Sequence, residues 1–117
     1  FSVLQMKALA DGTLEQCVDL GLQPMIWSPL AGGRLYNAGD DQARRVWAVL
    51  ADLAVQHGVS PTTVAYAWIL RHPSRPIPIT GSRRIHALQE AVAALALTLS
   101  AEDWYRIWQA SIGYEVP

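Results

Sequence analysis

The chain alternates between segments whose apolar residues recur every three or four positions and short apolar runs without this period. The first pattern is typical of helices with one buried face, and the second is typical of short buried strands. The pattern predicts helices over residues 13–20, 41–57, 61–71, 85–95 and 101–112. It predicts β-type runs over residues 1–4, 24–27 and 77–80, of which the first resembles the tail of a strand.

Most of these helical segments are flanked by residues that are typical of helix ends. Thr13 and Gln16 have the spacing of a capping box, in which the hydroxyl accepts hydrogen bonds from first-turn amides. Ser60 precedes Pro61, which combines an N-cap oxygen with a proline at the first helical position. Further N-caps are predicted at Asp40 or Asp41 and at Ser100, and helix ends at Gly21, Gly58 and Gly113.

The predicted order is strand, helix, strand, two helices, strand and two further helices. Helical crossovers between short, covered strands favour parallel pairing with right-handed connections, so the predicted fold class is α/β. Such strands are typical of a (β/α) barrel, which needs eight of them. Two strands and a strand end cannot close a barrel, so the sequence predicts part of one.

Composition narrows the class of protein. The 117 residues suffice for one small domain, and a net charge of −1 argues against nucleic acid or an anionic membrane as the main partner. No apolar run reaches the length of a membrane span and no leader is recognised, so the expected location is the cytoplasm. The single Cys17 excludes an internal disulfide and by itself makes no metal site, so no metal is expected.

Residues 24–35 carry the first candidate chemistry. Pro29 ends any strand ladder, and Gly32 and Gly33 allow positive φ or a close approach to a ligand. Arg34 adds a rigid set of donors beside them. This combination, with an aromatic face and a hydroxyl, would suit a ring joined to phosphates. A strand-to-helix turn with a packing tryptophan explains the same residues equally well.

A second stretch is rich in arginine and lacks acid. No Asp or Glu lies between residues 71 and 84, a segment that contains Arg71, Arg75, Arg83 and Arg84. It is either a local anion site or a solvated basic edge.

The histidines and most tryptophans have structural interpretations. His57 and His72 are expected to close helices, where a cation is favoured by the negative end of the helix dipole. His86 faces the turn at 81–84 and would add charge there. Core or helix packing is expected for Trp47, Trp68, Trp104 and Trp108.

Two motifs together resemble the last part of an aldo-keto reductase, a family of NADP-dependent (β/α)₈ oxidoreductases. They are Trp-Ser-Pro-Leu-Ala-Gly-Gly at 27–33 and Pro-Ile-Pro-Ile-Thr-Gly-Ser-Arg-Arg at 76–84. The resemblance extends over residues 12–14 and 60–71, and so over essentially the whole chain. It implies that residues 1–117 are the C-terminal segment of a single barrel domain, truncated at the N-terminus. That segment would hold strands six to eight with their helices and a C-terminal helix.

The resemblance also implies a binding site for the cofactor NADP(H). Trp27, at the end of strand seven, would stack on the nicotinamide ring. The turn that follows would line the pyrophosphate through Ser28, Pro29, Leu30, Gly32 and Arg34.

The turn after strand eight would hold the 2′-phosphate of the cofactor. Gly81 and Ser82 form this turn, and Arg83 would make a bidentate pair with the phosphate. This agrees with the phosphate sites of barrels, which lie in the loops after strands seven and eight.

The chain departs from the family pattern near these motifs. Many relatives have Lys where this chain has Ile79, so the neighbouring arginines would carry the charge. The Asn that contacts adenine is replaced by Ala91, and Gln89 or Glu90 would take its place.

The catalytic tetrad of the family has no counterpart in this chain. Its Tyr, Lys, Asp and His lie on the first four strands, whereas Lys7 is the only lysine here and follows strand six. The resemblance therefore predicts a fragment of an oxidoreductase that reduces aldehydes or ketones with NADPH, inactive alone. Two alternatives remain open. One is a non-enzymatic NADPH-binding subunit, and the other is a fragment of an unrelated phosphate-binding barrel enzyme, such as an isomerase or aldolase.

Overall fold

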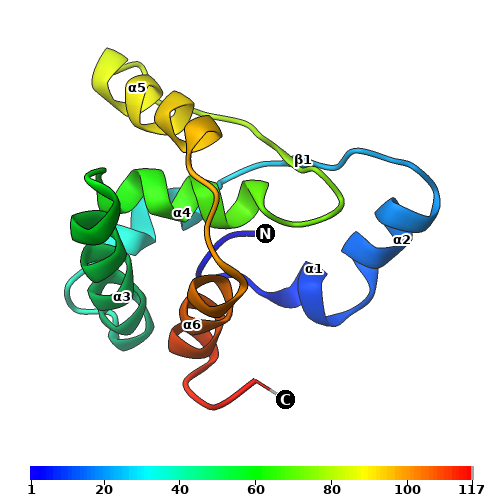
Figure 1. Cartoon of the computed structure of the whole chain (residues 1–117), viewed down its shortest axis with the longest axis horizontal. Coiled ribbons are helices and arrows are strands. Elements are labelled where there is room, and N and C mark those ends of the chain that lie inside the picture. The colour runs from blue at the N-terminus through cyan, green and yellow to red at the C-terminus, as the bar shows by residue number, and fades with distance from the viewer. Residues whose placement is uncertain (117) are drawn as a thin grey trace.

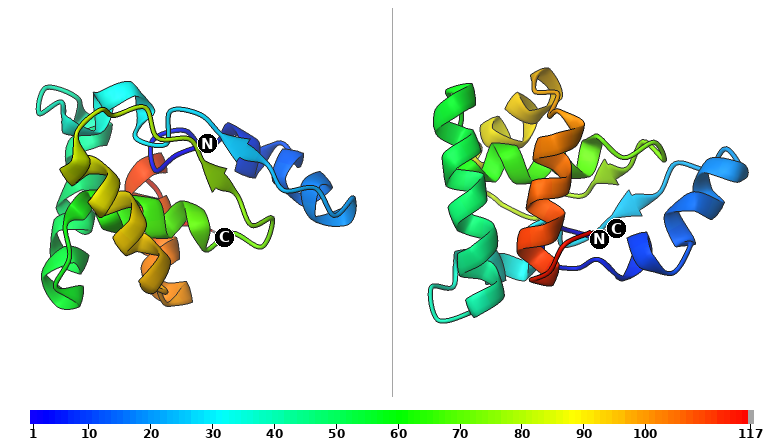
Figure 2. Two further views of the ribbon diagram at one scale, coloured as in Figure 1. Left: turned by 90° about the horizontal axis from the view of Figure 1, so that it is seen from above. Right: turned by 60° about the horizontal axis from the view of Figure 1, so that its bottom comes forward.

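Helix α4 (Pro61–Leu70) runs through the middle of the structure, a computed structural model that describes residues 1–116 (Figure 1). Helices α3 (Asp41–His57) and α5 (Ile85–Ala93) pack against it, together with the 3₁₀ turn η2 (Ala94–Ala96). Helix α6 (Ala101–Ile112) packs along α3. The other elements are α1 (Lys7–Ala10), α2 (Thr13–Asp19), β1 (Met25–Ile26), the 3₁₀ segment η1 (Ala31–Tyr36) and β2 (Ile77–Pro78). Helices α1 and α2 project to one side of the rest (Figure 2).

The central helix is buried around its whole circumference. All residues from 62 to 69 are buried, although the sequence predicted one buried face. A helix that is apolar on every side suits this position, because neighbours cover each face. Its two threonine side chains are paired: the Thr63 hydroxyl donates to the Glu90 carbonyl at 2.8 Å, and the Thr62 hydroxyl lies 2.7 Å from the Tyr36 hydroxyl. Helix α4 is therefore the element around which the rest of the chain packs.

Trp68 and Trp104 join α4 to α6 through hydrogen bonds in both directions. Each indole Nε1 donates to the main-chain carbonyl of the other residue at 2.9 Å. The rings are stacked, with centroids 5.0 Å apart and planes inclined by 11°. Because both indole N–H groups find acceptors, the pair is buried without an unsatisfied donor. The packing role predicted for these two tryptophans is confirmed.

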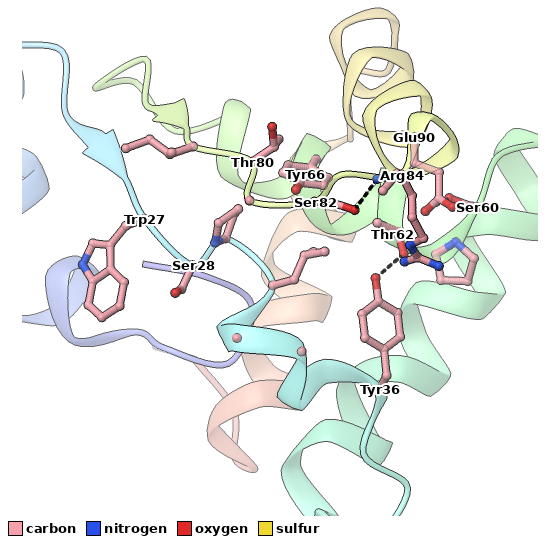
Figure 3. A pocket seen from close by; sticks show the side chains of 18 of the residues that line it. Trp27, Ser28, Tyr36, Ser60, Thr62, Tyr66, Thr80, Ser82, Arg84 and Glu90 are labelled. Carbon is pink, nitrogen blue, oxygen red and sulfur yellow. Dashed lines mark hydrogen bonds between the residues drawn. The ribbon is translucent and has the colours of Figure 1, made fainter.

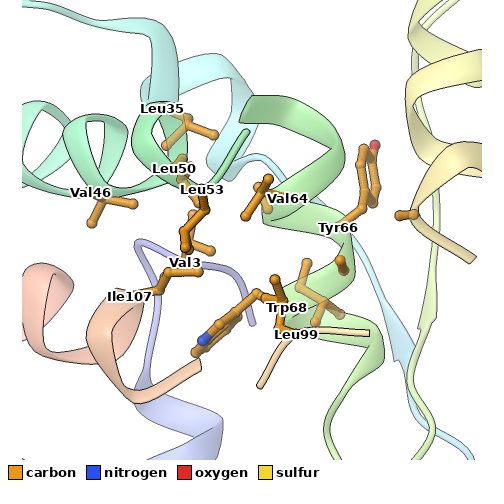
Figure 4. Packing of buried hydrophobic residues seen from close by; sticks show 14 of the residues in the cluster. Val3, Leu35, Val46, Leu50, Leu53, Val64, Tyr66, Trp68, Leu99 and Ile107 are labelled. Carbon is orange, nitrogen blue, oxygen red and sulfur yellow. The ribbon is translucent and has the colours of Figure 1, made fainter. Parts of the chain in front are cut away.

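Helix α3 turns an apolar stripe toward the core (Figure 4). Val46, Leu50 and Leu53 on this stripe are fully buried and belong to one cluster with Val3 and Ile107. The spacing of these residues is the reason why the sequence predicted α3 within a residue of its observed bounds.

Several predicted helix ends are confirmed in atomic detail. The Asp40 carboxylate accepts from the Ala43 amide at 2.9 Å, and Gly58 ends α3 in the left-handed region with φ 66°. The Ser60 and Ser100 hydroxyls each accept from the amide three residues later, at 3.1 Å. Local chemistry therefore determines where α3, α4 and α6 begin.

Strands β1 and β2 form a parallel pair, as predicted. Met25 lies opposite Ile77, and Ile26 lies opposite Pro78. The Ile77 amide donates to the Pro24 carbonyl and the Ile79 amide to the Ile26 carbonyl, both at 2.8 Å. This two-stranded sheet is open, and no barrel closes within residues 1–116. Both strands are shorter than the predicted runs.

The N-terminal region differs from the prediction. Residues 1–4 are no strand tail, because Ser2 and Gln5 exchange two backbone bonds of 3.1 and 3.0 Å across a tight turn. Thr13 is the first residue of α2 instead of its N-cap, and both its amide and its hydroxyl donate to Asp11. The predicted capping box is therefore wrong. Helix α1 and segment η1 were not predicted at all.

His72 is a buried residue with a role different from the predicted charged cap. Its Nδ1 accepts from the Ser74 amide at 3.2 Å and lies 2.9 Å from the Ser74 hydroxyl, and its ring faces Phe1 edge-on. The two contacts with Ser74 use the lone pair on Nδ1, which this nitrogen has only when it carries no proton. Burial lowers the pKa of His72 below its usual 6.5, although the charge of Glu15 opposes this shift.

Replacing Trp68 with Phe should lower the free energy of unfolding by about 2–4 kcal/mol, because it removes the hydrogen bond to the Trp104 carbonyl and opens a cavity. Equilibrium unfolding of the intact protein in urea measures this loss. Trp108→Phe is the matched control, since that indole is only partly buried and donates no hydrogen bond within residues 1–116. Equal losses in the two variants would contradict the role of the reciprocal bonds.

Protonation of His72 should destabilise the fold. Its folded-state pKa lies below 6.5, so the unfolded chain takes up the proton first. The contribution to stability is complete above pH 6.5 and is lost as the pH falls through the lowered folded-state pKa. Urea midpoints measured between pH 8 and pH 5 should fall less steeply for His72→Gln than for the parent protein. His57→Gln, at the exposed end of α3, should keep the parental slope.

Candidate cofactor-binding site

A cavity of about 940 Å³ opens beside the carboxyl ends of the two strands (Figure 3). Because β1 and β2 are parallel, the loops that follow them leave the sheet at the same edge. The segment 27–33 supplies one wall and the segment 79–84 another. The third wall comes from the start of α4 and the inner face of α5, through Ser60, Thr62 and Glu90.

The loop after β1 is tightly coiled. Ser28 and Ala31 have φ of 48° and 55°, and Gly32 and Gly33 have φ of 64° and 87°. Positive φ at two residues other than glycine is uncommon and is found most often where a loop serves binding or catalysis. The coil presents its backbone to the cavity and leaves the Trp27 side chain 76% exposed at one end.

Hydroxyl groups gather at the opposite end of the cavity. The Tyr36 hydroxyl lies 2.7 Å from the Thr62 hydroxyl and thereby ties η1 to α4. Tyr66, one turn further along α4, also lines the cavity. Burial raises the pKa of Tyr66, and the nearby Tyr36 and Glu90 add to this effect. The Tyr66 phenol therefore stays protonated at neutral pH and remains a hydrogen-bond donor.

An arginine and a glutamate add charge to the same end of the cavity as these hydroxyl groups. Arg84 precedes α5 and lines the cavity, as does Glu90 on that helix. The Glu90 carboxylate is held in place by the Ser60 hydroxyl at 3.2 Å and by His86 Nε2 at 2.7 Å. His86, which the sequence placed at the turn, is thus a partner of Glu90.

Most of the predicted site residues meet in this one cavity. Those that line it are Trp27, Ser28, Pro29, Leu30, Gly32, Gly81 and Ser82. Arg34, Arg83 and Gln89 are not among its lining residues. Arg34 Nε instead pairs with Asp40 at 2.6 Å, and a second nitrogen donates to Gln42. The Arg34 hydrogen bond is the main cause of a lowered Asp40 pKa.

The cavity also contains residues that the sequence did not assign to the site. They are Tyr36, Trp47, Thr62 and Tyr66, together with Ser60, which was recognised only as a helix cap. Tyr36 follows the first motif by three residues in η1, whereas Trp47 lies on α3 and the other three lie at the start of α4, far from both motifs in sequence. The position of Ser60 at the start of a helix was the one available signal, because helix starts often face ligands in α/β folds.

The residues present fit a dinucleotide in chemistry and in space. An exposed indole stands at one end, and hydroxyl donors and one arginine stand at the other (Figure 3). The volume lies within the range of small-molecule sites. Within residues 1–116 no group of three metal-ligating side chains occurs. Over the same residues no helix is both long and apolar enough to span a bilayer.

Comparison with known proteins identifies the family. The model of the aldo/keto reductase family matches residues 1–112, so the chain belongs to this family. It is 43% identical over 117 residues to oxidoreductase YdhF of Escherichia coli K12, covering 99% of this chain and 39% of that protein. It is 37% identical over 116 residues to 6-dehydroglucose reductase of Novosphingobium aromaticivorans, covering 99% of this chain and 38% of that protein.

A solved structure supports the barrel fold. The thermostable aldo-keto reductase Tm1743, crystallised with the inhibitor epalrestat, superposes with a TM-score of 0.77 at 24% identity. The superposition covers 94% of this chain and 37% of that one. The chain thus spans well under half the length of the proteins it matches, and its mostly helical structure corresponds to part of a (β/α)₈ barrel.

Proposed function

We propose that the protein containing this chain reduces aldehydes or ketones with NADPH, and that the cavity binds the cofactor. The observation that carries the proposal is the meeting of two loops at one edge of a parallel sheet. One loop brings Trp27 and the coiled backbone, and the other brings Gly81 and Ser82. Ligands of α/β proteins bind at the carboxyl ends of strands, and barrel phosphate sites use the last two loops.

In this proposal each wall of the cavity binds a different part of the cofactor. The Trp27 indole stacks on the nicotinamide ring and turns one ring face toward the substrate. Backbone amides of the coil after β1 face the pyrophosphate, and Ser82 with its neighbours faces the phosphate of the adenosine half. The hydroxyls of Tyr36, Thr62 and Tyr66 bound the far end of the cavity. NADPH, when bound, supplies the hydride.

The chain contributes cofactor binding and no proton donor for the carbonyl. We propose that residues 1–117 are the C-terminal segment of one barrel domain, holding strands six to eight, and that the catalytic tetrad lies outside them. The chain alone is then inactive. A cytoplasmic location and small carbonyl substrates complete the proposal. Because one relative is named 6-dehydroglucose reductase, a keto sugar belongs among the carbonyl compounds to be tested.

Of the two alternatives, the unrelated phosphate-binding barrel enzyme is excluded by membership of the aldo/keto reductase family. A non-enzymatic subunit that binds NADPH remains a second candidate. Oxidation of NADPH by the intact protein in the presence of aldehydes and keto sugars distinguishes it from a reductase. Binding without turnover of any carbonyl compound would favour the subunit.

Trp27→Leu should weaken NADPH binding by the intact protein about tenfold or more, because stacking of a ring on an aromatic side chain contributes about 1–3 kcal/mol. Titration followed by quenching of tryptophan fluorescence measures the Kd, and the variant should also lose part of the quench. Trp108→Leu, on α6 and outside the cavity, is the control and should keep the parental Kd. Equal affinity in the parent protein and Trp27→Leu would contradict the assignment of the nicotinamide end.

A further inference from the structure

A second cavity, of about 380 Å³, lies at the opposite end of α4 from the first. The residues that follow α4 form one wall of it, and aromatic residues of α6 form another. Leu9 of α1 and Glu15 of α2 line the remaining side. The two cavities share no lining residue, so binding to each of them can be measured separately.

His72 contributes a buried hydrogen-bond donor to this second cavity. The residue is only 8% exposed and is among those that line the cavity. Its Nδ1 accepts from the Ser74 amide, so the neutral ring carries its proton on Nε2. Within residues 1–116, Nε2 makes no hydrogen bond. A buried N–H group without an acceptor is unfavourable, and this donor is therefore suited to an oxygen atom of a ligand.

Glu15 contributes an acceptor close to this donor. Burial lowers the pKa of His72, and the negative charge of Glu15 opposes the shift, which indicates that the carboxylate lies near the ring. Among residues 1–116, no ion pair joins Glu15 to His72 or to any other cation. A hydroxyl group accepts and donates at once, so one hydroxyl fits between the His72 N–H and the carboxylate.

Arg71 places a positive charge in the same cavity. Its guanidinium forms no ion pair in the described part of the chain, and it lines the cavity together with Glu15. Two opposite charges disfavour a ligand that carries a single charge of either sign, because one of the two groups repels it. A neutral ligand with several hydroxyl groups satisfies the guanidinium, the carboxylate and the imidazole together.

The α6 wall of the cavity is aromatic. Tyr105 and Trp108 both line it, and their rings stack with centroids 5.7 Å apart and planes inclined by 17°. Trp104 stands edge-on to both rings, at 84° and 79°. Tyr105 is 46% exposed, so part of this aromatic surface is uncovered. The negative face of an aromatic ring attracts the C–H groups of a saturated ring as well as other aromatic edges.

We propose that this cavity binds a neutral sugar in its pyranose form. One sugar hydroxyl accepts from His72 Nε2 and donates to Glu15, a second hydroxyl accepts from Arg71, and the C–H groups of the ring pack against the aromatic residues of α6. A pyranose combines hydroxyl groups around its edge with C–H groups on its faces, which matches a cavity with polar groups on one side and aromatic rings on another.

Binding to the intact protein is measured with methyl glycosides of glucose, galactose and mannose, whose acetal leaves no carbonyl group for a reductase. Saturation-transfer NMR should detect at least one of them, with transfer to the ring C–H groups. Glucuronate and glucosamine carry one charge each and should bind more weakly than the neutral sugar. Absence of binding by all three glycosides would overturn the proposal, and so would tighter binding of either charged sugar.

Glu15→Ala should weaken binding of that glycoside about three- to tenfold, because the variant loses the acceptor for one hydroxyl group. Glu102→Ala is the matched control, since this exposed acid at the start of α6 lies outside the cavity. It should keep the parental Kd. Equal losses in the two variants would contradict the role of Glu15.

Tyr105→Ala should weaken binding about two- to tenfold through the loss of aromatic contact. Tyr114→Ala, an exposed tyrosine beyond α6 and outside the cavity, should have no effect. Circular dichroism verifies that each variant is folded. An unchanged Kd in Tyr105→Ala would remove the aromatic wall from the proposed site.

The sugar site and the proposed cofactor site fail independently. Trp27→Leu, which alters the first cavity, should leave glycoside binding unchanged. A protein that binds NADPH and no glycoside would overturn the sugar site alone. A protein that binds a glycoside and no NADPH would overturn the proposed function alone.

Discussion

The reciprocal bonds between Trp68 and Trp104 connect the buried centre of the structure to its last helix. Each indole satisfies a main-chain carbonyl of the other helix, so α4 and α6 have little freedom to slide past one another. The same α4 carries Thr62 and Tyr66 to the wall of the cavity. The helix that these bonds join to α6 therefore also carries part of the far end of the site.

The near end of the site depends on a much smaller interaction. Two backbone bonds between β1 and β2 bring the loops at 27–33 and 79–84 to one edge, although about fifty residues separate them in sequence. Met25 and Ile77 on these strands remain 71% and 44% exposed within the described part of the chain. In the barrel of the family, further strands would cover such positions. The sheet thus aligns the loops, whereas the helices supply most of the burial.

Arginine placement shows where reasoning from sequence reaches its limit. Arg34, Arg83 and Arg84 all lie in motifs that resemble the cofactor site of the family, and nothing in their order distinguishes them. In the structure Arg34 pairs with Asp40 and Gln42, while Arg84 lines the cavity and Arg83 does not. Which cation meets the cavity depends on the partners that the folded chain gives each arginine, and these cannot be read from the order of the residues. The hydroxyls of Tyr36, Thr62 and Tyr66 went unnoticed because only the fold brings η1 and the start of α4 to the same cavity.

The sequence by itself determined the helices α3, α4 and α6, the parallel strands and the family, because caps, glycine stops, apolar spacing and the two motifs are local signals. It misjudged residues 1–4, which form part of a tight turn instead of a strand, and Thr13, whose hydroxyl bonds to Asp11. Only the tertiary structure decided that α4 is covered on all sides, that His72 is buried with Ser74, and that Arg84 and Glu90 share a cavity. The physical reason is that burial and charge pairing depend on neighbours that the fold brings together from distant segments.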